Sequence, residues 1–224
     1  MRVKLPLFPL GTVLFPGLLL PLHVFEPRYR RLVGDLLAGP EPRQFGVIAI
    51  RKGRETGADG VSALFQIGCT ATLRRVIEHE DGRFDLVTVG TQRFRLGELD
   101  HSLPYLQATV EPLAEETGEQ AAAAAAAAAT TRAFREYVAA LGRRGRAGAG
   151  ADLSDLPDDP VRLSYLVAAS AVTGLPQQQA LLAEPDAVRR LTAEQALLAR
   201  ETAMLEALSA APDPGLPHSP YHPN

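Results

Sequence analysis

The 224-residue sequence has one cysteine, two lysines and no tryptophan. The lone Cys69 excludes an internal disulfide, and therefore a disulfide scaffold, and it favours a reducing compartment such as the cytoplasm. A nucleotide-binding phosphate loop ends in Gly-Lys-Ser or Gly-Lys-Thr, and neither Lys4 nor Lys52 stands in that setting. A Ser-Lys hydrolase meets the same shortage of lysines, and the sequence contains no Gly-x-Ser-x-Gly nucleophile motif. We therefore expect no catalytic residue and no cofactor.

The long uncharged run of residues 5–25 is not predicted to be a signal peptide or a membrane span. Prolines and glycines interrupt it about once per helical turn, and each interior proline costs a helix ~3 kcal/mol. The first alanine is Ala38, so no small-residue cleavage site follows at the distance that a signal peptide requires. We interpret the run as buried strands and turns, and we expect no membrane association. The interrupting residues are Pro6, Pro9, Gly11, Pro16, Gly17 and Pro21.

Residues 1–114 are predicted to form a β domain, because short runs of β-branched and aromatic residues alternate there with glycine and proline. The clearest feature is a hairpin, whose Asp81-Gly82 turn supplies the positive backbone angles that a tight turn requires. Cys69 alternates in phase with Ala71 before this turn, so we expect it in the core. Seven segments are predicted as strands: VKLPLF, LLLPLHVF, FGVIAI, FQIGCTATLRRVI, RFDLVTVG, RFRLGEL and YLQATVEPL.

The segment PLHVFEPRYRRLV joins a predicted strand to a helix that begins at Pro27 and ends at Gly39. Glu26 and Arg28 flank the proline that starts this helix. Glu26 lies beside the positive helix end and an arginine nearby can pair with it, so we favour a structural ion pair over contact with a ligand.

Residues 115–208 are predicted to form a helical domain, because the apolar pattern changes there to the helical period and alanine becomes frequent. A long helix is expected from Glu115 to Leu141. A flexible linker rich in glycine and arginine is expected to follow over residues 142–152.

Three more helices are expected after the linker, followed by a proline-rich tail, residues 209–224, that is predicted to be disordered. The last helix carries an apolar stripe with steps of three and four residues, which needs a partner helix. That partner is either a second copy of the chain, giving a homodimer, or a helix of the same domain. The prolines that begin the three helices are Pro160, Pro176 and Pro185; the stripe consists of Val188, Leu191, Gln195, Leu198, Thr202 and Leu205.

Candidate metal ligands and nucleophiles are few. His218 and His222 have the i, i+4 spacing of a zinc-binding helix, but Pro220 excludes that helix. No cysteine, aspartate or second histidine accompanies His23, so we expect it to be a hydrogen-bonded structural residue rather than a metal ligand. Cys69 lies in an alternating strand without a cationic neighbour, and burial raises a thiol pKa, so it is not expected to be a nucleophile.

Five arginines in and after the hairpin, interleaved with two phenylalanines, have the composition of a surface for single-stranded nucleic acid. Acidic residues in the same hairpin and the net charge of −3 favour a mixed solvated surface instead. We therefore do not expect nucleic acid as a partner. The basic stripe consists of Arg74, Arg75, Arg83, Arg93 and Arg95 with Phe84 and Phe94; its acidic neighbours are Glu78, Glu80, Asp81 and Asp85.

Taken together, LPLFPLGTVLFPGLLLPLHVFEPRYRRLV closely resembles the opening of the Lon protease N-terminal domain. FGVIAI, IGCTATL, RFDLVTVGTQRFRL and PYLQATVEPL are similar to the later strands of that domain, in the same order. QQQALLAEPDAVRRLTAEQALLARE resembles its helical segment, including Leu181, Leu182, Asp186, Arg190 and Leu191. The resemblance assigns a structural signature to Pro21, Glu26, Arg28, Tyr29, Gly90 and Arg93, and no residue to peptide binding. It extends to about Leu208, and the alanine run and the glycine-arginine linker depart from the family pattern.

The resemblance implies an α+β fold, with an N-terminal PUA-like mixed β-barrel, one inserted helix and a C-terminal helical bundle. It implies a non-enzymatic module that binds unfolded or tagged polypeptides as an adaptor or regulator, with a protease or chaperone as a further partner. Because the sequence ends before the ATPase and protease domains of Lon would begin, we expect a stand-alone member of the family. An RNA-binding PUA-like protein is the alternative.

Overall fold

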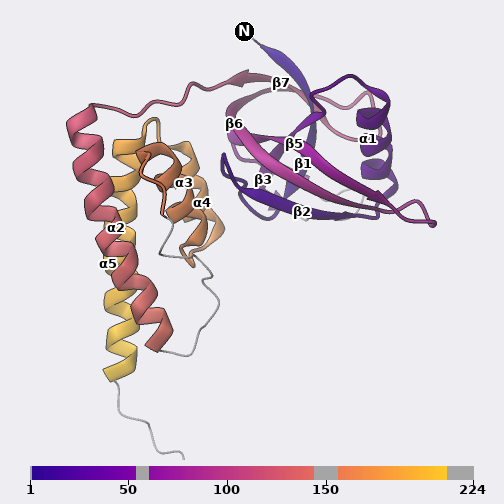
Figure 1. Ribbon diagram of the computed structural model, residues 1–224. Helices are drawn as coiled ribbons and strands as arrows, with labels where there is room; N and C mark the ends of the chain where they lie inside the picture. Colours follow the sequence, from indigo (N-terminus) through magenta and orange to yellow (C-terminus); the bar gives the residue numbers. More distant parts are fainter. Residues whose placement is uncertain (1, 54–60, 144–155, 211–224) are drawn as a thin grey trace, which may run out of the picture.

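The computed structural model describes residues 2–53, 61–143 and 156–210. Strands fill the first half of the chain and four helices fill the second, and the two halves lie side by side (Figure 1). We call them the sheet region, residues 3–112, and the helical region, residues 120–210. Within the described ranges, no helix combines the length and the apolar character needed to cross a membrane.

Seven strands make up the sheet region, and β1 closes a ring of paired strands. The strand order is β1-β7-β6-β5-β3-β4, and β2 pairs with β6 beside this path. Because β1 pairs with β3 as well as with β7, five strands form a continuous circuit. The strands are β1 (Val3–Leu10), β2 (Leu19–Val24), β3 (Gln44–Gly53), β4 (Val61–Leu64), β5 (Ile67–Glu78), β6 (Phe84–Asp100) and β7 (Gln107–Pro112).

The strands differ from the predicted segments in two places, the first of which is β4, since no predicted segment covers Val61–Leu64. RFDLVTVG and RFRLGEL form one continuous strand, β6, since its register shifts against β5 and β7 let it bend without ending. The predicted hairpin between β5 and β6 is present, and Gly82 adopts the positive φ of 75° that its turn requires. Cys69 is fully buried, which confirms its expected place in the core.

One helix, α1 (Pro27–Ala38), packs on the side of the sheet region that faces away from the other helices (Figure 1). Its buried face contains Tyr29, Leu32 and Val33, and the Tyr29 ring stacks on Phe8 with 4.0 Å between ring centroids. The helix begins at Pro27 and stops before Gly39, as its sequence predicts.

The helical region contains α2 (Gln120–Arg143), α3 (Pro160–Ser170), α4 (Leu175–Ala183) and α5 (Ala187–Ala210). The predicted helix start at Glu115 is wrong by five residues, because the Glu119 carboxylate accepts hydrogen bonds from the amides of Ala121 and Ala122 and so begins α2. The predicted linker lies outside the described residues except for its first two positions, which belong to α2. The predicted tail lies outside them from residue 211 onward, and α5 includes its first two residues.

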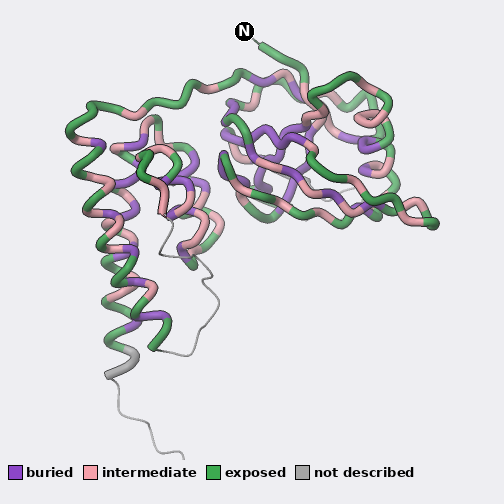
Figure 2. Tube along the Cα trace, in the orientation of Figure 1, coloured by how far each residue is buried: buried purple, intermediate pink, exposed green. Residues whose placement is uncertain are grey.

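The apolar stripe of α5 packs inside its own chain, which is the second of the two alternatives. Helices α2 and α5 run side by side, and Figure 2 shows buried residues along both of them. Leu191 and Leu198 are fully buried against the Phe134 and Tyr137 side of α2. Gln195 interrupts the stripe and donates a hydrogen bond to Thr130 Oγ1 at 3.0 Å. Because Leu191 and Leu198 are fully buried within the chain, the structure favours this alternative over the homodimer predicted through the same stripe.

Glu194 is a buried carboxyl group on the inner side of α5. It is 0% exposed, and neither of its oxygens has a hydrogen-bond partner among the described residues. Burial raises the pKa of Glu194 well above its ordinary value of 4.5, and the attraction of Arg190 opposes that rise only in part. At a pH between 4.5 and the raised pKa, Glu194 is therefore protonated in the folded chain and ionised in the unfolded chain.

We expect the substitution Glu194→Gln to weaken the pH dependence of stability. Above the ordinary pKa of 4.5 the unfolded state releases the proton, so the free energy of unfolding of the original protein falls as the pH rises through the folded pKa. Denaturant unfolding between about pH 5 and pH 8 should show this fall shrink by at least ~1 kcal/mol in the variant. Glu206→Gln, at an exposed position of the same helix, is the control and should leave the profile unchanged. Identical profiles for both variants would contradict the assignment.

Candidate functional site

Arg93 on β6 carries the contacts that join the sheet region to the helical region. Its side chain is 2% exposed, and its Nε donates to Glu115 Oε1 at 3.0 Å. Its Nη1 donates to the carbonyl oxygens of Leu182, at 2.9 Å, and Glu184, and its Nη2 donates to that of Pro185 at 3.3 Å. The last carbonyls of a helix have no partner within the helix, so a buried cation is well placed at this end of α4.

Arg190 on α5 holds the same end of α4 from the other side. Its Nε donates to the Leu181 carbonyl and its Nη2 to the Glu184 carbonyl, both at 3.0 Å. Its Nη1 donates to Ser164 Oγ at 2.9 Å, and its guanidinium lies 4.1 Å from the centre of the Tyr165 ring. Burial lowers the pKa of Arg190, and these acceptors and the aromatic ring stabilise the charged form against that loss of solvation.

Glu115 is the acceptor that both regions share. It receives hydrogen bonds from Arg93 and from the hydroxyl group of Tyr165. Burial raises the pKa of Tyr165, so its phenol stays protonated and donates. We call Arg93, Glu115, Tyr165 and Arg190 the junction cluster. Arg93 and Tyr165 both donate to Glu115, and the Arg190 guanidinium lies over the Tyr165 ring, so the cluster links the sheet region to the helical region.

A cavity of about 440 Å³ lies beside the junction cluster, between the sheet region and α4. Its deepest walls are apolar, since Leu64 and Ile67 are both buried, and its rim contains the exposed Arg51. We call it the junction cavity. Its lining residues are Arg51, Leu64, Phe65, Gln66 and Ile67 from the sheet region, and Pro176, Gln179, Ala180 and Ala183 from α4.

Gln179 places an unused hydrogen-bond acceptor at the wall of the junction cavity. Its side chain is 5% exposed, and its Nε2 donates to the Ile67 carbonyl at 2.8 Å. Its Oε1 is buried and has no hydrogen-bond partner among the described residues. Leaving a buried acceptor unpaired costs about 1–3 kcal/mol, so a ligand that brings an N–H group to Oε1 recovers that energy.

Strand β4 leads directly into the cavity wall and leaves one edge open. It pairs with β3, and in the part of the chain that the structure describes no strand pairs with its other side. An open edge presents backbone N–H and C=O groups that can pair with another extended chain. The cavity and this edge share the segment around Leu64.

The six signature positions do not lie in one place. Pro21 lies on β2, and Glu26, Arg28 and Tyr29 lie at the start of α1, which packs on the side of the sheet region that faces away from the other helices (Figure 1). The predicted ion pair is present there, with 3.1 Å between Arg28 Nη2 and Glu26 Oε2. Arg93 lies at the junction instead.

Steric contact with the loop between β1 and β2 requires a glycine at position 90 on β6. A Cβ atom at this position would lie 2.3 Å from the Phe15 carbonyl oxygen, so a larger residue does not fit without a backbone shift. Its amide also donates to the Leu18 carbonyl, which ties the loop between β1 and β2 to β6.

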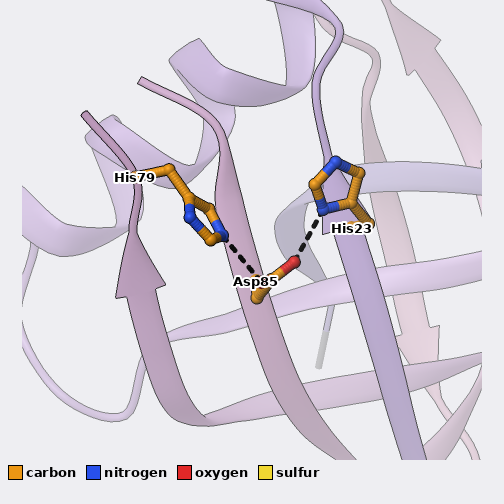
Figure 3. A group of neighbouring side chains, drawn as sticks. All are labelled: His23, His79 and Asp85. Atoms are coloured by element: carbon orange, nitrogen blue, oxygen red, sulfur yellow. Dashed lines mark hydrogen bonds and ion pairs between the residues drawn. The ribbon is translucent and has the colours of Figure 1, made fainter. Parts of the chain in front are cut away.

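The expectation that no aspartate or second histidine accompanies His23 is wrong. His23 Nδ1 lies 2.6 Å from Asp85 Oδ1, and His79 Nε2 lies 2.7 Å from Asp85 Oδ2 (Figure 3). These hydrogen bonds lower the pKa of Asp85, His23 first and His79 second. His23 lies on β2, Asp85 lies on β6 and His79 directly follows β5, so strand pairing brings them together and spacing along the sequence does not reveal the cluster.

The other sequence candidates have ordinary structural roles. Burial raises the pKa of the Cys69 thiol to about 12, which agrees with an inert core residue. The basic stripe does not form one surface, because Arg93 is buried and Arg83 pairs with Asp81 at 2.6 Å. Both of its phenylalanines, Phe84 and Phe94, are buried and cannot stack on bases. His218 and His222 lie outside the described residues.

Sequence reasoning missed Glu115, Tyr165 and Gln179 as partners at the junction. The sequence does carry a signal for a buried charge in α5, where Glu194 stands at helical core spacing between Leu191 and Leu198, but Glu194 is not a partner at the junction. No comparable signal marks Gln179, since its role depends on how α4 meets β5.

The family model described as the ATP-dependent protease La (LON) substrate-binding domain matches residues 4–200. The chain belongs to this family. Lon protease 2 of Syntrophobacter fumaroxidans is 26% identical over 209 residues, which is 91% of this chain and 25% of the relative. Lon protease of Escherichia coli is 25% identical over 191 residues, or 85% of this chain and 24% of the relative. The chain thus spans about a quarter of the length of these relatives.

Two solved structures support the assignment. The N-terminal domain of a Mycobacterium avium complex Lon protease has the same fold, with a TM-score of 0.65 at 19% identity, covering 90% of this chain and 98% of that one. A Lon N-terminal domain protein from Xanthomonas campestris has a TM-score of 0.58 at 25% identity, covering 88% and 98%. The chain therefore has the mixed α+β fold of Lon N-terminal domains, and its family supports a role in substrate recognition.

We expect the substitution Arg93→Met to destabilise the protein by about 3–5 kcal/mol, because it leaves Glu115 without its buried cation and the end of α4 without donors. Denaturant unfolding followed by circular dichroism measures this loss. The matched control is Arg95→Met, two residues along the same strand at an exposed position, and it should change stability by less than ~0.5 kcal/mol. Equal losses in the two variants would contradict the role given to Arg93.

Proposed function

We propose that this chain is a non-enzymatic substrate-recognition module that binds unfolded or tagged polypeptides, in extended conformation, at the junction cavity and the open edge of β4. One observation carries the proposal: in a member of a substrate-binding domain family, an apolar cavity with an unused buried acceptor adjoins an unpaired strand edge. The strand edge can pair with the backbone of an extended peptide, the cavity can hold one of its side chains, and Gln179 Oε1 can accept from an N–H group that the edge leaves free.

The backbone edge supplies affinity that does not depend on sequence. An added strand makes main-chain hydrogen bonds to an open sheet edge, and alternate side chains then point to the same face. One of those side chains enters the junction cavity between Leu64, Ile67 and Ala180. Gln179 Oε1 accepts an N–H group from the bound segment.

Selectivity in this arrangement is low and affinity is modest. A flexible polypeptide pays ~2–5 kcal/mol for its ordering when it binds, which lowers affinity for a given contact area. That balance suits capture and release of many different clients. It also fits an adaptor or regulator that works with a protease or chaperone, which we include in the proposal.

The architecture that we propose for this function is a PUA-like β-barrel followed by a helical bundle. The circuit of five paired strands supports the barrel, and the close packing of α2 with α5 supports the bundle. RNA binding, the other known use of PUA-like barrels, is the less favoured function here because the net charge is −3 and the phenylalanines of the basic stripe are buried.

We expect the substitution Ala180→Trp to weaken binding of an unfolded client at least about tenfold, because the indole fills the cavity from its exposed rim. The probe is a reduced and alkylated protein carrying a fluorescent label, and binding is followed by anisotropy. Ala125→Trp is the matched control, since it adds the same side chain at an exposed position of α2 outside the cavity. It should bind like the original protein.

Two results would contradict the proposal. The first is an absence of binding by the original protein at high concentration. The second is equal binding by the Ala180→Trp and Ala125→Trp variants. Salt-dependent binding of structured RNA, with no binding of the unfolded protein, would reverse the order of the two functions.

A further inference from the structure

Strands β2 and β6 and the turn that follows β5 bring His23, Asp85 and His79 to one outer face of the sheet region. The pairing of β2 with β6 places His23 directly opposite Asp85. The pairing of β5 with β6 places Ile77 opposite Asp85 as well, and His79 follows Ile77 by two residues. Because side chains alternate along a strand, this register alone directs all three polar side chains to the same face.

The side chains converge as the register predicts. Both imidazoles turn a nitrogen toward the Asp85 carboxylate (Figure 3), at 2.6 Å for His23 and 2.7 Å for His79. One ligand atom from each of the three residues lies within 4.8 Å of the other two. The hairpin turn holds His79 in place, since its amide donates to the Arg83 carbonyl and its carbonyl accepts from the Gly82 amide.

We propose that His23, His79 and Asp85 form a binding site for a divalent transition-metal ion such as Zn²⁺. Two imidazoles and one carboxylate are a donor set that zinc and its neighbours prefer, whereas Mg²⁺ and Ca²⁺ require mostly oxygen ligands. Ligands at about 2.0–2.1 Å from a tetrahedral ion lie ~3.3 Å from one another. The three side chains reach that spacing by small rotations.

The surroundings of the cluster leave room for these rotations and for the ion. The side chains of His23, His79 and Asp85 are 48%, 39% and 46% exposed, so the ion can enter directly from solvent. The open side of the site accommodates a water molecule as the fourth ligand. The Phe25 ring lies 6.2 Å from the His23 ring, and none of the three residues lines the junction cavity.

Arg83 is a neighbouring cation that opposes a bound metal ion. Its Nη1 lies 3.5 Å from His23 Nε2, and its Nε donates to Asp81 at 2.6 Å. When His23 Nδ1 binds the ion, the ring proton moves to Nε2, which then faces the guanidinium as a second donor. Arg83 must turn away for the ion to bind. Its removal therefore strengthens binding, which a hydrogen-bonded cluster without a metal function would not predict.

The experiment is a calorimetric titration of the full chain with zinc chloride, followed by cobalt(II) absorption spectroscopy to report the ligand geometry. We expect one ion per chain at micromolar affinity. His79→Gln and Asp85→Asn should each weaken binding by at least the ~10–100-fold that loss of a supporting residue costs in known sites. Arg83→Gln should tighten it several-fold. Arg83 is exposed and His79 and Asp85 are half-buried, and circular dichroism verifies that each variant folds.

Two control variants separate this site from other histidines. His101→Gln alters an exposed histidine outside the cluster and should leave zinc affinity unchanged. A double substitution of His218 and His222 by glutamine removes the other histidine pair of the chain and should also leave it unchanged. Failure of the original protein to bind zinc overturns the proposal. Binding that survives His79→Gln and Asp85→Asn but is lost with the His218 and His222 pair overturns it as well.

Discussion

The arrangement of the two regions depends on the hydrogen bonds that the buried guanidinium of Arg93 makes to Glu115 and to the end of α4. Removing a charged group from water costs several kcal/mol unless partners replace the water. Here Glu115 supplies the opposite charge, and the carbonyls of Leu182, Glu184 and Pro185 supply the remaining acceptors. Those carbonyls exist in the right place only at the end of α4. Burial of Arg93 is therefore compensated only when α4 packs against β6 in this orientation.

The junction cavity is a consequence of that docking. Helix α4 meets β5 through Gln179, whose amide group reaches the Ile67 carbonyl, while its small alanines leave the space beside it unfilled. Ligand sites are mostly apolar concave surfaces with a few polar groups, and we propose that a client polypeptide occupies this one. The metal site proposed at His23 does not share residues with the cavity.

Much of the fold could be predicted from the sequence, because periodicity and turn residues act locally. The hairpin at Gly82, the helix that begins at Pro27 and the buried setting of Cys69 all follow from such signals. The site could not be predicted in the same way. The His23 cluster and the partners of Arg93 depend on strand register and on the docking of a helix, and neither property is encoded in the spacing of residues along the chain.

Arg93, one of the six signature positions, has a physical role, because its contacts join the sheet region to the helical region. Arg93 stands in a strand of alternating residues, and the sequence gives no sign of its contact with Leu182, which lies 89 residues away. The recognition surface that we propose lies beside this contact, where the two regions meet. Amide hydrogen exchange with and without an unfolded client tests that placement most directly. Protection confined to residues 61–67 and 175–183 is the predicted result, and protection confined to α2 and α3, or none, would contradict it.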